Sequence, residues 1–69
     1  MIYAFQHKLI KMIRKPKSDS FISVSLYETG AGFRVDYEQQ GKTRRGETVK
    51  DYNLASFMFD TKLQDLEGQ

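Results

Sequence analysis

The sequence predicts a single small α+β domain spanning residues 1–69, with the element order α-β-β-β-α. Three observations predict it: helical spacing of apolar residues in 1–15, alternating apolar and polar residues in 21–38, and helical spacing again from Leu54. We expect a three-stranded antiparallel sheet with both helices packed on one face. Because a chain of 69 residues without cysteine buries only a small core, a second copy or a larger protein is the expected source of further burial.

The first helix is predicted from apolar residues that fall within about 100° on a helical wheel. These residues are Ile2, Phe5, Leu9, Met12 and Ile13. The opposite face carries polar and basic side chains: His7, Lys8, Lys11, Arg14 and Lys15. Pro16 is expected to end this helix, because proline disfavours helix in the preceding residue and cannot continue one.

The next segment has the period of two that is typical of strands with one buried face. Its apolar positions are Ile22, Val24 and Leu26 in the first strand, and Phe33, Val35 and Tyr37 in the second. Glycines between these strands, in 29–32, favour a hairpin turn because they adopt positive φ angles. A second turn is predicted at 39–42.

The third strand, about Lys42 to Val49, is polar and contains Gly46, so we expect an edge strand or a strand with a bulge.

The last helix follows, capped by Asp51 or Asn53 and ending near Gly68. It carries two apolar stripes: Leu54, Phe57, Met58 and Thr61 in one, and Phe59, Leu63 and Leu66 in the other. Since one sheet covers one stripe, the other is expected to meet the first helix or another subunit.

The composition argues against an enzyme. There is no cysteine and only one histidine, His7, which has no neighbouring nucleophile and is interpreted as a solvated side chain. We therefore expect no catalytic residues, no metal, no cofactor and no small-molecule substrate. Asp36 and Glu38 share a strand face and are interpreted as polar sheet surface.

No stretch approaches the roughly 18 apolar residues of a membrane span, and no secretory signal is evident, so a cytoplasmic location is expected.

The small net charge of +2 hides a segregated charge distribution. Residues 1–17 carry +5, 18–41 carry −3, 42–50 carry +3 and 51–69 carry −3. Basic clusters of this kind bind nucleic-acid phosphates, and glycines beside them permit close backbone approach. The candidate nucleic-acid contacts are Lys42, Arg44 and Arg45, joined by Arg34 and by Lys8, Lys11, Arg14 and Lys15. A solvated helix face and protection of a sheet edge are the alternative explanations of these charges.

The stretch from Gly32 to Glu67 contains Gly32-Phe33-Arg34-Val35-Asp36-Tyr37, then Gly41-Lys42-Thr43-Arg44-Arg45, then a helix from Leu54. It resembles the arm-type DNA-binding domain of tyrosine recombinases. The resemblance implies a three-stranded sheet followed by a helix, with the sheet inserted into the major groove of double-stranded DNA. It covers roughly half of the chain; the first segment and the acidic Asp36 and Glu38 depart from it. The whole layout is also similar to small uncharacterised bacterial proteins of the YkuJ type, for which no activity is implied.

Two functions are therefore predicted for a small non-enzymatic binding protein of bacterial or phage origin. The first is nucleic-acid binding through the basic residues of the third strand and first helix. The alternative is a protein-interaction module, either a homodimer or an inhibitor or accessory factor that docks on a larger protein. Its expected interface lies on the last helix: Phe57, Met58, Phe59 and Leu63.

Overall fold

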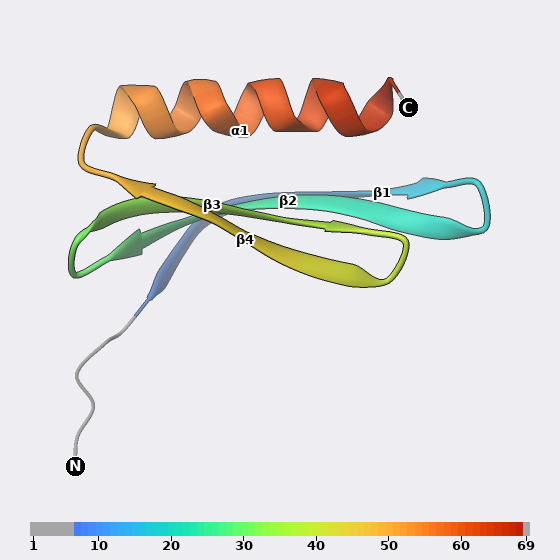
Figure 1. Cartoon of the computed structure of the whole chain (residues 1–69), viewed down its shortest axis with the longest axis horizontal. Coiled ribbons are helices and arrows are strands. Elements are labelled where there is room, and N and C mark those ends of the chain that lie inside the picture. Colours follow the sequence, from blue (N-terminus) through green and yellow to red (C-terminus); the bar gives the residue numbers. More distant parts are fainter. Residues whose placement is uncertain (1–6, 69) are drawn as a thin grey trace, which may run out of the picture.

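The computed structural model describes residues 7–68, and its elements follow the order β-β-β-β-α. The strands are β1 (Lys8–Lys17), β2 (Ser20–Thr29), β3 (Gly32–Gln39) and β4 (Lys42–Val49), and the helix is α1 (Tyr52–Glu67). The strands form one antiparallel sheet in the order β1-β2-β3-β4. The helix lies along one face of the sheet (Figure 1), and we call the face turned away from it the open face.

The prediction of three strands and two helices is wrong, because the segment expected to be the first helix contains strand β1. A bulge explains the misleading spacing. The pairing with β2 shifts between Leu9 and Lys11, so one extra residue is inserted into the edge strand. Leu9 then pairs with Tyr27 and Met12 with Ser25, which places both on the open face despite their helix-like spacing of three. The part of the predicted helix in 1–6 lies outside the described residues.

Pro16, which was expected to end a helix, lies inside β1 opposite Phe21. Proline has no N–H to donate, and an edge strand tolerates it because one side of that strand has no neighbour. The turn to β2 follows at Ser18 and Asp19, with Ser18 at a φ of 55°. The proline therefore marks the sheet edge rather than a helix end.

The turn predicted at 39–42 is confirmed as a tight hairpin between β3 and β4. Gln40 and Gly41 both have positive φ, 54° and 77°, as a type I′ turn requires. The strand predicted over Lys42 to Val49 as an edge strand or a strand with a bulge is both: β4 lies at the sheet edge, and its register shifts between the partners of Arg34 and Asp36. Gly46 occupies this bulge, where a Cβ would lie 2.2 Å from the carbonyl oxygen of Val35.

The C-terminal helix is confirmed with its predicted caps. The Leu54 N–H donates to Asp51 Oδ2 at 3.2 Å, and the Gly68 N–H donates to the Gln64 carbonyl oxygen at 3.0 Å. The core lies between this helix and the two central strands, β2 and β3. Its buried apolar residues are Ile22, Val24, Leu26, Val35, Ala55, Phe59 and Leu66.

Candidate binding groove

The basic residues of β1 fasten the helix to the sheet. Lys17 Nζ donates hydrogen bonds to the carbonyl oxygens of Leu66 (2.8 Å) and Glu67 (2.9 Å). These carbonyls end α1 and have no partner within the helix, and the helix dipole is negative there. The ammonium group of Lys17 therefore closes the C-terminal end of α1.

Two further lysines of β1 point to the same helix. Lys15 Nζ forms an ion pair with the Glu67 carboxylate, and Lys11 Nζ lies 4.6 Å from the centroid of the Phe59 ring. Lys8 lies opposite Glu28 in the strand register, at the other end of β1 and on the helix side of the sheet. The structure thus places Lys11 and Lys15 in contact with α1 instead of on a free basic helix.

Arg34 lies on the open face but is 8% exposed. Its Nε and Nη2 donate to the two carboxylate oxygens of Asp36 at 2.8 and 3.1 Å, in the forked geometry that suits this pair. Its guanidinium also lies 5.3 Å from the Tyr27 ring. The N–H of Gly46 donates to the same carboxylate at 3.4 Å, so the pair also holds the bulge of β4. Arg34 is therefore engaged within the sheet.

The remaining basic candidates lie on opposite faces of the sheet. Arg45 lies opposite Asp36 in the strand register and is on the open face. Arg14 is on the same face, and its guanidinium stacks 4.4 Å from the centroid of the Phe21 ring. Lys42 and Arg44 are on the helix side of β4 and are exposed. The eight residues predicted for nucleic-acid binding therefore do not form one continuous surface.

The four residues predicted for a protein interface differ in how far they are buried. Phe59 is 1% exposed and fills the core, while Met58 and Leu63 are partly buried against that core. Phe57 is 66% exposed. Of the two apolar stripes of α1, the one with Phe59 and Leu66 covers the sheet, and no described element covers the outward side of the other.

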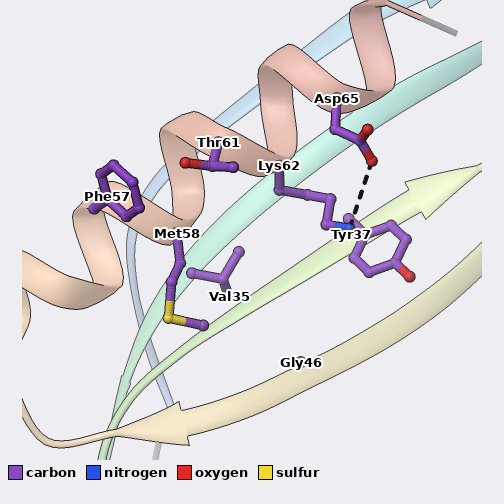
Figure 2. A pocket seen from close by; sticks show the side chains of 8 residues that line it. All are labelled: Val35, Tyr37, Gly46, Phe57, Met58, Thr61, Lys62 and Asp65. Carbon is purple, nitrogen blue, oxygen red and sulfur yellow. Dashed lines mark ion pairs between the residues drawn. The ribbon is translucent and has the colours of Figure 1, made fainter.

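A groove of about 350 Å³ runs between α1 and strands β3 and β4. Its lining is Val35, Tyr37, Gly46, Phe57, Met58, Thr61, Lys62 and Asp65. Figure 2 shows Val35 on β3 and Met58 on α1 projecting into the space between these elements. Gly46 is the β4 residue that lines the groove, and it contributes no side chain to it (Figure 2).

The polar end of this groove is arranged around the Tyr37 ring. Lys62 Nζ lies 4.4 Å from the ring centroid and 3.8 Å from an Asp65 carboxylate oxygen (Figure 2). The sequence signals for the groove were present but separate: an apolar stripe with Phe57 and a bulge at Gly46. The first helix predicted from the sequence could cover the apolar stripe of Phe57. Residues 8–15 belong to strand β1 instead, so they do not cover this stripe.

Among residues 7–68, no group of three or more His, Cys, Asp or Glu side chains is arranged to hold a metal ion. No helix in the same range has the length and apolar character needed to cross a membrane. In comparisons with known proteins, no family model matches the chain, and neither curated proteins nor solved structures show significant similarity to it.

Proposed function

We propose that this chain is a non-enzymatic protein-interaction module that binds a segment of another polypeptide in the groove between α1 and β4. The observation that carries the proposal is Phe57, an aromatic side chain 66% exposed at the edge of an apolar groove. Aromatic anchors beside pockets contribute much of the affinity of protein interfaces. Burying the exposed part of this ring on binding contributes about 1 to 2 kcal/mol.

The shape of the groove supports a segment as ligand. Val35 and Met58 line it, and its volume of about 350 Å³ suits one or two side chains. A second exposed apolar residue, Leu54, precedes Phe57 by one helical turn. A bound segment therefore gains an apolar contact surface that continues along α1.

A phage-displayed library of random peptides tests this function. Immobilised wild-type protein is expected to enrich peptides whose affinity falls at least tenfold in Phe57→Glu, because a carboxylate replaces the exposed ring. Phe21→Glu is the matched control, since Phe21 is an exposed aromatic residue on the open face. The proposal fails if no peptide is enriched, or if the enriched peptides bind Phe57→Glu as well as wild type.

Nucleic-acid binding is the second candidate, and the separation of charge between the layers favours it. Residues 8–50, which form the sheet layer, contain ten basic and five acidic side chains, whereas 51–67 contain one basic and four acidic ones. The sheet layer therefore carries +5 and the helix layer −3. Arg14 and Arg45 are exposed on the open face, away from the acidic helix.

Binding of labelled duplex DNA at two salt concentrations tests the second candidate. Affinity should fall as salt rises, and the double variant Arg14→Gln/Arg45→Gln should bind several-fold more weakly than wild type. Absence of binding at low salt, or unchanged binding by that variant, would exclude DNA as a ligand of the open face. The resemblance to the arm-type DNA-binding domain stays a prediction.

A further inference from the structure

A second pocket adjoins the apolar groove at the hairpin between β3 and β4. Its volume is about 260 Å³, and it is lined by Tyr37, Gln39, Gln40, Lys42 and Arg44. Tyr37 lines both spaces, so the apolar groove and this polar, cationic pocket adjoin at the same ring. A ligand that follows the groove toward the hairpin therefore meets two positive charges.

The cations of this second pocket are available to a ligand. Lys42 and Arg44 are exposed, and within residues 7–68 neither forms an ion pair with an acidic side chain. Two other basic residues of the sheet differ in this respect, since Lys15 forms an ion pair with Glu67 and Arg34 forms one with Asp36. The pairing of Lys42 with Gln39 and of Arg44 with Tyr37 directs both side chains to the helix side.

We infer that the ligand of the groove is an acidic peptide segment, in which a bulky apolar residue is followed within a few positions by Asp or Glu. The apolar side chain packs between Val35, Met58 and Phe57. The carboxylate binds Lys42 and Arg44 beside Tyr37. This inference rests on the proposed function and adds the charge of the partner to it.

A second copy of the chain fits the groove less well than an acidic segment does. Pairing of two β4 strands would bring together two segments, residues 42–50, that each carry +3. The bulge at Gly46 also interrupts the regular ladder of hydrogen bonds along this edge, as bulges on edge strands commonly do. Both features oppose self-pairing, and the positive charge favours an anionic partner.

Separate selections of the same peptide library on wild-type protein and on two variants test whether the ligand is acidic. Wild-type protein is expected to enrich peptides with an apolar residue and nearby Asp or Glu. Lys42→Gln/Arg44→Gln should enrich peptides with the apolar residue but without the acidic preference, and should bind the wild-type peptides about tenfold more weakly at low salt. Arg45→Gln is the matched control because it removes a charge from the open face of the same strand. It should select the same peptides as wild type.

The outcomes separate this inference from the proposed function. Enrichment of apolar peptides without an acidic preference by wild type overturns the inference and leaves the groove as a protein-binding site. Absence of any enrichment overturns the proposed function itself. Concentration-dependent self-association in sedimentation, abolished by Phe57→Glu, would overturn the inference in favour of a second copy. Loss of duplex DNA binding in Lys42→Gln/Arg44→Gln, with no peptide enriched by wild type, would overturn it in favour of nucleic acid.

Discussion

The two edges of the sheet are both basic, yet their charges have different surroundings. At β1, Lys17 and Lys15 contact the C-terminal end of α1, and Lys11 lies over the buried Phe59 ring. At β4, neither Lys42 nor Arg44 pairs with an acidic side chain of residues 7–68. The helix packs mainly on β2 and β3; the long lysine side chains of β1 reach across to it, whereas a groove lies between the helix and β4.

This difference shows that a cluster of lysines and arginines in a sequence does not by itself indicate a binding surface. Contact with the helix distinguishes the basic side chains of β1 that are used within the fold from Lys42 and Arg44, which are exposed without an acidic partner among residues 7–68. On α1 the same contrast separates Phe59, which is buried beneath Lys11, from Phe57, which is exposed beside the groove.

Truncation of the two aromatic residues should affect stability very differently. Phe59→Ala removes a fully buried ring and is expected to lower the free energy of unfolding by about 3 to 4 kcal/mol. Phe57→Ala should change it by less than about 1 kcal/mol, because that ring is mostly exposed already. Urea unfolding followed by circular dichroism measures both values. Equal losses would show that Phe57 belongs to the core.

The bulge of β4 should tolerate no side chain at its glycine. In Gly46→Ala the new Cβ would lie 2.2 Å from the backbone oxygen of Val35, so the strands must move apart, at a cost of about 2 to 3 kcal/mol. Gly30→Ala is the control, because a Cβ there meets nothing within 4 Å. Its free energy of unfolding should stay within about 0.5 kcal/mol of wild type or rise slightly. Similar losses in both variants would contradict the bulge geometry.

Removing one ammonium group from each edge compares the edges directly. Lys17→Met keeps most of the apolar stem but loses both hydrogen bonds to the end of α1, so unfolding should become easier by about 1 kcal/mol. Lys42→Met makes the same chemical change at β4 and should alter stability by less than about 0.5 kcal/mol. Thermal unfolding of the two variants gives the comparison. A larger loss of stability in Lys42→Met than in Lys17→Met would contradict the conclusion that the β1 edge, and not the β4 edge, stabilises the fold through its lysines.

The exposed ion pair between Lys15 and Glu67 should contribute least. A double-mutant cycle with Lys15→Gln and Glu67→Gln is expected to give a coupling energy of about 0.3 to 0.5 kcal/mol, which high salt reduces. A coupling energy near zero would mean that, of Lys15 and Lys17, only Lys17 stabilises the C-terminal end of α1.

The sequence predicted most of the chain after residue 20 correctly. Alternation in Ile22, Val24 and Leu26, a turn at 39–42, and a helix cap at Asp51 or Asn53 are local features; the structure shows the first two and places the cap at Asp51. Strand β1 was missed because its bulge puts Leu9 and Met12 on one face at a spacing that also suits a helix. Pairing between strands, which no local pattern contains, decided between the two structures.

The candidate groove was predictable only in part. An excess apolar stripe on the last helix was visible in the sequence, and it led to an interface that included Phe57. The spacing did not show that Phe59 faces the core or that Val35 and Tyr37 meet α1 beside Gly46. Nor did it show that lysines of β1 would reach across to the helix end, since these contacts join residues about fifty positions apart.

Two matched double variants measure the central difference between the edges most directly: Lys42→Gln/Arg44→Gln at β4 and Lys11→Gln/Lys15→Gln at β1. Each is titrated with a peptide that wild-type protein has enriched, and each is unfolded in urea. We predict that the β4 variant binds about tenfold more weakly with an unchanged free energy of unfolding, and that the β1 variant loses stability while the folded protein binds normally. Equal loss of binding in both variants, or loss only at β1, would contradict the account.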